Sequence, residues 1–553
     1  MTRPRDADRR RWLVAAAALP LAGLAACDAP RQPGYGGEWV GAQHERGHRL
    51  RDAGRALPAP EVHKRAGVLV VGAGIAGLAC ARTLAQAGID DVHLFDLEDT
   101  AGGNSRGHRM GGMACPLGAH YLPVPGDDAV ELIELLESLG LRRTEGGRAV
   151  HDERHLCHSP QERLFIDGHW HEGLLPPVAA LPEAQRDATL AQYRRFADLV
   201  SQVGPPGTFM LPTARSAWTP AMQALDGVTF ARWLDEQGVT ALPLRWYLDY
   251  CCRDDYGAGA AQVSAWAGLH YFASRHGFHA PGDDARAHDE GVLTWPEGNA
   301  WLAQRLAAPL SGRLHDGCVA LALEEGRHEV VLDLWNVKAQ RAERWTAAHA
   351  VLATPLFIAG RVLRTPPTAL KAAVAQMRHA PWLVANLQLS DALQDLPGAP
   401  PSWDNVLYGS STLGYVDAMH QSTRAYPGPT VLTAYWALGG DNEAQLLAQR
   451  KRLLEQPWQA WAQAVVQNLS EAHADLGDKL VRVDLMRYGH AMSIPLPGVR
   501  GSAALAALAR DGGAGGRVQF AHADLSAYSV FEEAYFHGHA AARRVAARLK
   551  GRA

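Results

Sequence analysis

The sequence predicts an α/β fold in which a parallel-sheet domain carries an inserted α+β domain. First, Val68–Val71 is a continuous apolar run, which is typical of a buried parallel strand. Second, a glycine-rich turn and a helical segment from Leu78 to Ala87 follow directly, and another apolar strand from Val92 to Phe95 comes next. Third, a chain of 553 residues, 47% of them hydrophobic, is long enough for two or more domains with buried cores.

The glycine-rich turn has the spacing of a dinucleotide-binding loop. It reads Gly72-Ala73-Gly74-Ile75-Ala76-Gly77, and Asp96 ends the second strand. Gly72 permits the tight turn, Gly74 lets the backbone approach a pyrophosphate, and Gly77 lets helix and strand pack closely. Free N–H groups at the helix N-terminus attract phosphates, and Asp96 is placed to accept hydrogen bonds from a ribose. Strand, glycines, helix, strand and acid in this order predict a Rossmann-like domain.

The segment after the second strand indicates which dinucleotide the loop binds. Gly102-Gly103-Asn104, with Arg106 two residues on, resembles the double-glycine motif of the flavin amine oxidase superfamily, which includes monoamine and polyamine oxidases, protoporphyrinogen oxidases and carotenoid desaturases. In those families an Arg often follows the glycines directly, and here Asn104 takes that place. Gly118-Ala119-His120-Tyr121 resembles the superfamily's Gly-Ala-His-aromatic segment beside the flavin. The resemblance implies FAD as the cofactor, with these residues around it.

Segments farther along the chain carry the same resemblance. Val319 lies in a strand similar to the one whose backbone meets the adenine. Near the C-terminus, Asp524 and Ala534 match the acid and the helix that contact the ribityl-phosphate region in the superfamily. His522 departs from the usual Ala-Gly-acid pattern. Because these patches are far apart in the chain, the resemblance implies an FAD domain assembled from three separated segments.

The resemblance and the periodicity of the chain together predict its layout. The predicted parts are a signal peptide at 1–27, a linker at 28–65, FAD-domain segments at 66–125, 291–365 and 486–553, and substrate-domain segments at 126–290 and 366–485.

The path of the electrons also follows from the motifs. No second glycine fingerprint follows a strand, so we do not expect a separate NAD(P)H site. Electrons would come from a small-molecule substrate and leave to oxygen or a membrane acceptor. The last of seven Cys is Cys318, far from the C-terminal motif near which monoamine-oxidase-like enzymes attach FAD, which predicts noncovalent binding. The Cys spacings do not resemble a metal site, and a net charge of −4 gives no basic field for nucleic acid.

Acids interleaved with aromatic residues mark the substrate segments. The segment 246–272, and the shorter runs Trp403-Asp404-Asn405 and Tyr415-Val416-Asp417, suit a cationic amine through ion pairing and cation–π contact. The residues predicted to bind the substrate are Asp249, Asp254, Asp255, Tyr256 and Trp266. The alternative interpretation of this pattern is a packed helix pair with a solvated acidic end.

The predicted activity is oxidation of an amine, with a polyamine as one option, by hydride transfer to FAD. Many amine oxidases place a Lys near the reactive flavin nitrogen. Here Val384 aligns with that position, and none of the six Lys lies in its strand. This departure leaves two alternatives open: a desaturase or protoporphyrinogen-oxidase-like enzyme acting on a hydrophobic substrate, and a non-catalytic FAD-binding protein. No catalytic residue is predicted.

The N-terminus has the form of an export signal. Arg9, Arg10 and Arg11 precede an apolar stretch from Trp12 to Ala26, which is short for a spanning helix of about 20 residues. The arginines resemble a twin-arginine motif, and Leu24-Ala25-Ala26-Cys27 resembles a lipobox whose Cys27 receives lipid. These features predict export of the folded, cofactor-loaded protein and a lipid anchor in the periplasm. A plain amphipathic or anchor helix is the alternative.

Overall fold

The computed structural model describes residues 34–50, 59–157, 161–179, 181–205, 207–275, 277–281, 291–513 and 516–551. The predicted signal peptide, including Cys27, lies outside these residues. No helix within the described ranges is both long and apolar enough to cross a membrane.

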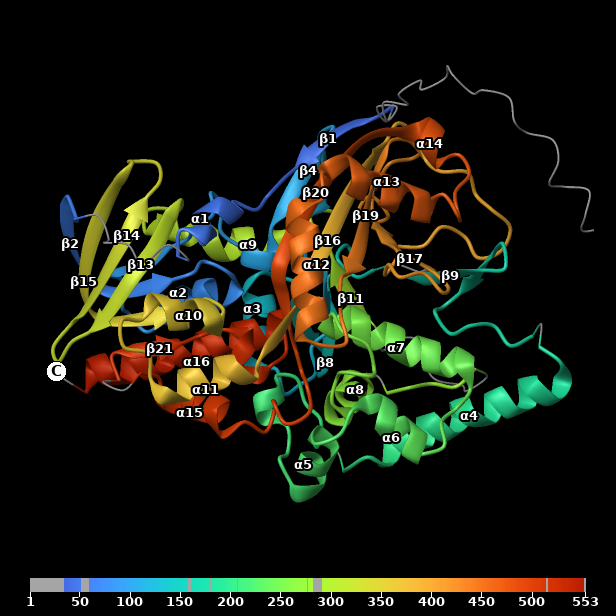
Figure 1. The fold of residues 1–553 in the computed structure, drawn as a ribbon, viewed down its shortest axis with the longest axis horizontal. Helices are drawn as coiled ribbons and strands as arrows, with labels where there is room; N and C mark the ends of the chain where they lie inside the picture. The colour runs from blue at the N-terminus through green and yellow to red at the C-terminus, as the bar shows by residue number, and fades with distance from the viewer. Residues whose placement is uncertain are drawn as a thin grey trace, which may run out of the picture. The chain divides into compact units, whose positions relative to one another are not determined.

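A seven-stranded sheet forms one half of the structure, and its strands come from three separated segments (Figure 1). Its strands run in the order β12 (Leu314–His315), β3 (Val92–Phe95), β2 (Val62–Val71), β15 (Arg341–Leu352), β14 (Val330–Asn336) and β13 (Cys318–Glu325), with β21 (Val518–Phe520) also pairing with β15. The pairs that include β2, β3, β12 or β21 are parallel, and those of β14 are antiparallel. The apolar run at the end of β2 is buried, as expected for a central parallel strand.

Two helices, α2 (Ile75–Gln86) and α16 (Phe531–Lys550), pack against each other beside this sheet and share one hydrophobic core. A Cβ atom on Gly538 would collide with the carbonyl oxygen of Ala76, and one on Gly77 would collide with that of Gly72. Both positions therefore require glycine because the backbones approach too closely for any side chain. This packing brings the N-termini of the two helices to the same end of the sheet.

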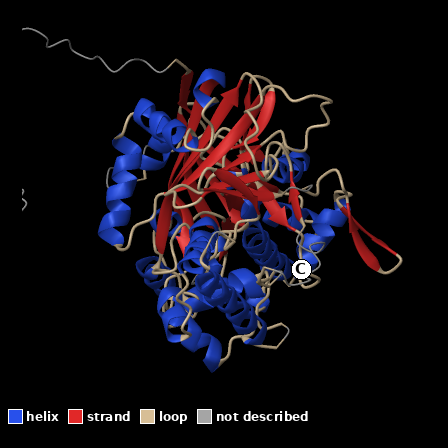
Figure 2. Cartoon of the chain, turned by 90° about the vertical axis from the view of Figure 1, so that its right-hand side faces the viewer, coloured by secondary structure: helices blue, strands red, loops and turns tan. Residues whose placement is uncertain are grey.

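An eight-stranded sheet forms the other half. Its strands run in the order β1 (Gly36–Trp39), β20 (Leu480–Ile494), β16 (Arg378–Leu389), β19 (Thr430–Ala437), β18 (Tyr415–Asp417), β17 (Asp404–Leu407), β9 (Glu162–Ile166) and β10 (His169–Glu172). Helices α12 (Glu443–Glu455) and α13 (Trp458–Leu469) cover one face, with Leu453 and Trp461 in the core. The opposite face packs against a helical layer, visible below the strands in Figure 2.

The helical layer comprises α4 (Glu183–Gln202), α5 (Pro220–Asp226), α6 (Phe230–Glu236), α7 (Leu242–Tyr256) and α8 (Ala265–Ala273). Its core contains Phe196 and Phe230 and includes Val384 from β16, so the layer and the sheet form one packed unit. The connecting elements are α1 (His44–His48), β4 (Gly107–Met110), β5 (Met113–Pro116), β6 (Tyr121–Pro123), α3 (Val130–Ser138), β7 (Arg142–Glu145), β8 (Arg148–His151), β11 (Val292–Thr294), α9 (Ala300–Ala307), α10 (Leu356–Val362), α11 (Thr368–Gln376), α14 (Leu476–Lys479) and α15 (Ala503–Asp511).

Two parts of the predicted layout are wrong. The predicted linker at 28–65 contains β1, which pairs in parallel with β20, as well as α1 and the start of β2. The sequence of this segment does not reveal the strand, because a four-residue strand at a sheet edge needs little apolar periodicity. Helix α3 was placed in the substrate domain, but its Leu132, Leu135 and Leu136 lie in the core formed by α2 and α16.

Candidate active site

A cavity of about 330 Å³ runs past the ends of β2 and β3, where the glycine motif was predicted to bind a dinucleotide. It is lined by Gly72, Gly74, Ile75, Ala76, Asp96, Gly102, Gly103, Asn104, Ala119, Val319, Asp524 and Ala534 among others. These residues come from all three segments of the predicted FAD domain. The structure thus gathers them around one space of the size used by small-molecule ligands. We call this space the cofactor cavity.

Two helix N-termini provide the positive potential of the cofactor cavity. Gly74 precedes α2 and Val530 precedes α16, and neither helix start has a side-chain cap. Both residues line the cavity, together with the first turns that follow them. Among the described residues no lysine or arginine lines it. Uncapped N–H groups and helix dipoles are therefore available as donors for a diphosphate here, and His379, His490 and His522 also line the cavity.

Asp96 lies at the end of β3 and is held by the glycine loop itself. Its Oδ2 accepts a hydrogen bond from the Ala73 backbone N–H at 2.7 Å, and its Oδ1 accepts one from the Glu98 N–H at 2.9 Å. Burial raises the pKa of this carboxyl, while the two backbone donors oppose the rise. The remaining lone pairs suit a ribose hydroxyl, in line with the predicted role.

Asp524 occupies the opposite wall of the cofactor cavity. It accepts hydrogen bonds from the Leu356 N–H at 2.9 Å and from His379 Nε2 at 3.1 Å. Burial alone would raise its pKa, but His522 and His379 bring the pKa well below the usual value. The unusual His522 thus faces the acid of its own motif, which keeps the carboxylate ionised.

Gly77 and Arg106, both predicted to bind the cofactor, do not line its cavity. Gly77 serves the packing of α2. The Arg106 side chain donates to the backbone oxygens of Gly103 at 3.0 Å and Gly41 at 2.9 Å, and it pairs with Glu98. The assignment of Arg106 to direct contact is therefore corrected: it positions the double-glycine turn. A sequence motif cannot separate these roles, because both depend on the same spacing.

A second space of about 140 Å³, the inner cavity, adjoins the first and shares Asn104, Ala119 and Phe531 with it. The predicted segment Gly118–Tyr121 lines it, and Val384 lies where a Lys had been considered. His120 stacks on Tyr435 with ring centroids 4.4 Å apart. The inner cavity is also lined by Trp382, Tyr488, Asp254, Asp255, Arg275 and Glu532. It is where the reactive end of a flavin would meet a substrate.

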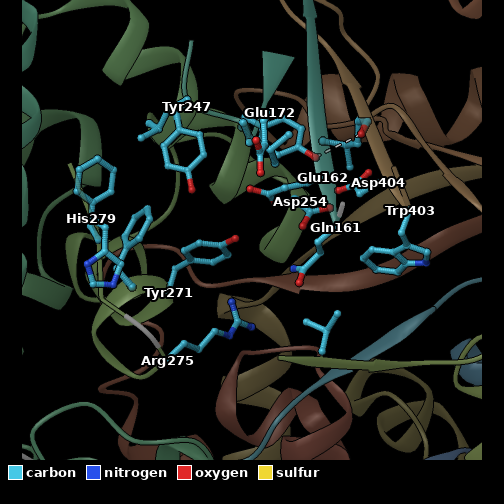
Figure 3. A pocket seen from close by; sticks show the side chains of 18 of the residues that line it. Gln161, Glu162, Glu172, Tyr247, Asp254, Tyr271, Arg275, His279, Trp403 and Asp404 are labelled. Atoms are coloured by element: carbon cyan, nitrogen blue, oxygen red, sulfur yellow. Dashed lines mark hydrogen bonds between the residues drawn. The ribbon is translucent and has the colours of Figure 1, made fainter. Parts of the chain in front are cut away.

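A third space, of about 590 Å³, adjoins the inner cavity and shares His120, Tyr121, Asp254 and Arg275 with it. We call it the outer cavity. Its walls combine acids with aromatic rings, as Figure 3 shows around Asp254, Tyr271 and Trp403. Substrates would therefore reach the inner cavity along an acidic, aromatic passage.

Three acids converge on one side of the outer cavity. Glu162 on β9 and Asp404 on β17 are direct cross-strand partners, and Asp254 from α7 points toward them (Figure 3). Burial raises the pKa of Asp254 to about 7, with Asp255 adding to the rise. Burial, Asp254 and Glu162 together hold the pKa of Asp404 well above its usual value. Each of these acids in its ionised form disfavours ionisation of its neighbours, and a cation in the cavity would favour the ionised forms.

The nearest cation already has its own partners. Arg275 Nη2 donates to Asp255 Oδ1 at 3.1 Å and lies 2.9 Å from the Tyr528 hydroxyl, which in turn donates to Asp255. The charge of Asp255 is thus matched by Arg275. Among the described residues, no ion pair or hydrogen bond reaches the Asp254 carboxyl group.

Only two of the five predicted substrate residues, Asp254 and Asp255, line these cavities. Asp249 accepts a hydrogen bond from the Ala260 N–H at 2.9 Å and pairs with Arg253. The Tyr256 hydroxyl donates to the Ala267 carbonyl at 2.8 Å, and Trp266 stacks on His270 in the core. These three assignments are corrected, because packing and capping account for the side chains, as the alternative interpretation held.

Of the two shorter aromatic-acid runs predicted from the sequence, only one brings both its aromatic ring and its acid to a cavity. Trp403 and Asp404 line the outer cavity, whereas Tyr415 bonds to His473 and Asp417 accepts from Thr430. Four further residues that line these cavities were not predicted from the sequence, namely Glu162, Arg275, Tyr435 and Glu532. A charged residue in a strand, as at Glu162, was the one local signal available.

Comparison with known proteins places the chain in a family. A model described as "Flavin containing amine oxidoreductase" matches residues 75–546. Putrescine oxidase of Kocuria rosea is 29% identical over 173 residues, which cover 30% of this chain and 30% of that protein. The match therefore spans less than a third of that relative's length.

Solved structures share the fold. A putrescine oxidase bound to putrescine is 16% identical with a TM-score of 0.60, covering 88% of this chain and 100% of that one. Cyclohexylamine oxidase from Brevibacterium oxydans IH-35A is 20% identical with a TM-score of 0.62, covering 88% and 99%. These likenesses confirm the α/β fold class. Because the family model extends from the glycine loop to the last helix, the chain belongs to the flavin-containing amine oxidoreductases and is an FAD-dependent oxidoreductase.

Proposed function

We propose that this enzyme oxidises a diamine or polyamine, and that the acids of the outer cavity bind the ammonium group distant from the reacting nitrogen. The observation that carries the proposal is the placement of Asp254 beside the cross-strand pair Glu162 and Asp404. The charge of Glu162 adds to the rise of the Asp404 pKa, because like charges on neighbouring strands repel each other. A cation bound in the outer cavity would offset this repulsion.

The surrounding rings favour the same ligand. Trp403, Tyr247 and Tyr271 line the outer cavity around the acids (Figure 3). Aromatic faces attract cations, and the attraction grows when water is excluded. An ammonium group in this cavity would therefore be held by carboxylates and rings together, as in the sequence-based expectation but with a different set of acids.

The two cavities suit the two ends of such a substrate. Hydride loss from carbon requires a neutral reacting nitrogen, so the acid cluster serves the other, charged nitrogen. The flavin supplies the hydride acceptor when bound. A substrate that reaches from the outer cavity into the inner cavity must carry its positive charge at one end and its reacting C–N bond at the other.

A hydrophobic substrate, the alternative kept open by the missing Lys, is less favoured. The inner cavity has an apolar wall at Trp382 and Val384. An apolar polyene would have to pass the acids of the outer cavity without compensating them, and burying charges without partners is unfavourable.

Noncovalent FAD is part of the proposal. No cysteine of the described chain lines the inner cavity, where the flavin ring would lie. Cys318 lies on β13 in the cofactor cavity beside Val319, and burial raises the pKa of its thiol to about 12. Acid precipitation should release the yellow colour into the supernatant, and colour that stays in the pellet would contradict this part.

Export by the twin-arginine route, a lipid anchor at Cys27 and a periplasmic location remain proposals carried by the N-terminal motif. Replacing Arg9 and Arg10 with Lys should trap the protein in the cytoplasm, and Cys27→Ala should release the exported protein from the membrane. Unchanged fractionation of both variants would refute the proposal. Oxygen or a membrane carrier would reoxidise the flavin.

The decisive experiment measures anaerobic flavin reduction by α,ω-diamines and by monoamines of the same length. Diamines should reduce the flavin with higher apparent affinity. Asp254→Asn should weaken diamine affinity by about 10- to 100-fold, or about 1.4–2.7 kcal/mol, and leave monoamines nearly unchanged.

Asp249→Asn is the matched control, because Asp249 lies on the same helix but lines none of the cavities described above. Equal diamine affinity in wild type and Asp254→Asn would refute the distal site. Failure of every amine to reduce wild-type flavin would refute amine oxidation.

A further inference from the structure

Glu532 is a buried acid in the inner cavity that the proposed function does not use. It is the second residue of α16 and is 4% exposed. It lines the inner cavity together with Tyr435 and Val384, next to the residues shared with the cofactor cavity. Its carboxyl group therefore faces the place where a substrate would meet the flavin.

The neighbouring Glu533 shows that this placement is not simply helix capping. Glu533 accepts hydrogen bonds from the Thr213 N–H and from the Ser526 hydroxyl, so its carboxylate is satisfied within the protein. Among the described residues no other residue donates a hydrogen bond to the Glu532 carboxyl group, which has only its own backbone N–H nearby. A buried acid without a protein partner is costly to keep unless a ligand uses it.

The groups around Glu532 set its protonation. Burial raises its pKa to about 7, Arg275 opposes the rise, and Asp255 and Glu533 add to it. The other titratable groups that face the inner cavity are Asp254, His120, Tyr121, Tyr435 and Tyr488. An acid with a pKa near the working pH is suited to take up a proton and release it again.

The chemistry needs such a group. An alkylamine resembles a lysine side chain, whose pKa is about 10.4, and enters protonated at neutral pH. It must lose one proton before its carbon can release a hydride. None of the six lysines lines the three cavities. Burial lowers the pKa of His120 to about 4, and burial raises those of Tyr121 and Tyr435 well above the usual value, so none of them is an effective base.

Within the described part of the chain, Asp254 and Glu532 are then the two acids of the inner cavity without a partner. Asp254 also borders the outer cavity, where its charge serves the distal ammonium, whereas Glu532 lines only the inner one. We propose that Glu532 is the catalytic base that removes a proton from the reacting nitrogen, a role that rests on the proposed amine oxidation.

The step balances without another reactant. The N–H bond of the bound ammonium breaks, its electron pair stays on nitrogen, and the proton forms an O–H bond on the Glu532 carboxylate. The freed nitrogen lone pair can then form the C=N bond of an iminium product as the carbon loses a hydride, for which bound FAD would be the acceptor. The low-dielectric site that raises the pKa of the acid also lowers the pKa of the ammonium group. The two pKa values therefore approach each other, and the proton transfer has a small free-energy change. The proton returns to water when product leaves.

The test compares wild type with Glu532→Gln, which has nearly the same shape. The rate of flavin reduction by a diamine should rise with pH through about 7 in the wild type. Glu532→Gln should lose this rising limb of the pH profile. Its flavin should be reduced roughly 100-fold or more slowly at pH 7, and the rate should recover only as the pH approaches the pKa of the amine. Flavin content and unfolding temperature report whether the variant is intact.

A second substrate separates the base from a structural role. An amine that carries three fluorines on its β-carbon is a much weaker base and is largely neutral at pH 7, so it needs no protein base. The ratio of wild-type to Glu532→Gln rates should fall from roughly 100 to below about 10 with this substrate. Glu532→Asp should retain the pH limb at a reduced rate, and it serves as the test variant if Glu532→Gln binds no flavin.

Two results would overturn the inference. Equal ratios for both amines, or an unchanged pH profile in Glu532→Gln, would show that Glu532 is not the base while amine oxidation stands. Absence of wild-type flavin reduction by any amine would overturn the proposed function and this inference together.

Discussion

The cofactor cavity and the outer cavity recognise charge in opposite ways. The first is shaped by backbone: glycines, two uncapped helix N-termini and no lysine or arginine among the described residues that line it. The second is shaped by side chains, with Glu162, Asp254 and Asp404 brought together from β9, α7 and β17. Partial charges of backbone N–H groups are fixed, whereas carboxylates titrate and respond to salt. Cofactor binding in the first cavity and substrate binding in the second should therefore be weakened by different perturbations.

The largest expected effect is on the cofactor cavity. Gly74→Val should abolish FAD binding, because the side chain would fill the space that the pyrophosphate needs. A Cβ on Gly74 meets only Gly103 Cα at 3.8 Å, so the apoprotein should still fold. Flavin absorbance per protein and circular dichroism measure both effects. Gly126→Val, at a position with open space, is the control. Normal flavin content in Gly74→Val would show that the cavity does not hold the diphosphate here.

A smaller but clear effect is expected where backbone meets backbone. Gly538→Ala should lower the free energy of unfolding by about 1–3 kcal/mol, because its Cβ would press on the Ala76 carbonyl and separate α2 from α16. Urea unfolding measures the change. Gly477→Ala in α14, where nothing lies within 4 Å, should cost nothing. Equal stability of Gly538→Ala and wild type would mean that the two helices can move apart freely.

Replacing Asp254 with Asn should make the folded protein more stable while it weakens diamine binding. Its folded pKa of about 7 lies above the unfolded value of 3.8, so the folded state binds more protons and stability falls as the pH rises between these values. Above pH 7 Asp254→Asn should therefore be more stable than wild type by about 1–2 kcal/mol, discounted because the carboxyl borders an open cavity. Below pH 4 the two should be equal. Thermal unfolding across pH checks this, with Asp249→Asn showing no gain.

The smallest expected effect is that of salt. Raising the ionic strength should weaken diamine affinity by roughly twofold to fivefold, because the outer cavity is open to screening ions. Flavin content should not change over the same range. If flavin were lost at a lower salt concentration than the one that weakens amine affinity, the cofactor cavity would be the more salt-sensitive of the two, contrary to this expectation.

The same contrast explains what sequence alone could predict. The residues Gly72, Gly74 and Asp96 line the cofactor cavity because a backbone loop of fixed geometry requires fixed spacing, which leaves a local pattern. The outer cavity leaves no such local pattern in the sequence. Glu162 and Asp404 are cross-strand neighbours although 242 positions separate them in the chain, so only the sheet register reveals the pair.

Helix α7 shows a second limit. Asp249, Asp254 and Asp255 all belong to one acidic-aromatic pattern, yet Asp249 caps a neighbouring turn, Asp255 pairs with Arg275, and only Asp254 presents an unpartnered carboxylate. Side chains at different positions of a helix point in different directions, and tertiary packing determines which of them faces a cavity. The predicted linker failed for a related reason, since β1 is defined by its partner β20 rather than by its own residues.

That short edge strand has a consequence for how long the cofactor stays. The segment after β1 continues through Gly41, which accepts a hydrogen bond from Arg106, to Gly47 and Leu50 in the wall of the cofactor cavity. One end of this strap is fastened to β20 by parallel pairing, and the other lines the cofactor cavity, where it would lie against a bound dinucleotide. We therefore expect FAD release to be coupled to the local opening of β1, which hydrogen exchange of the four strand amides reports directly.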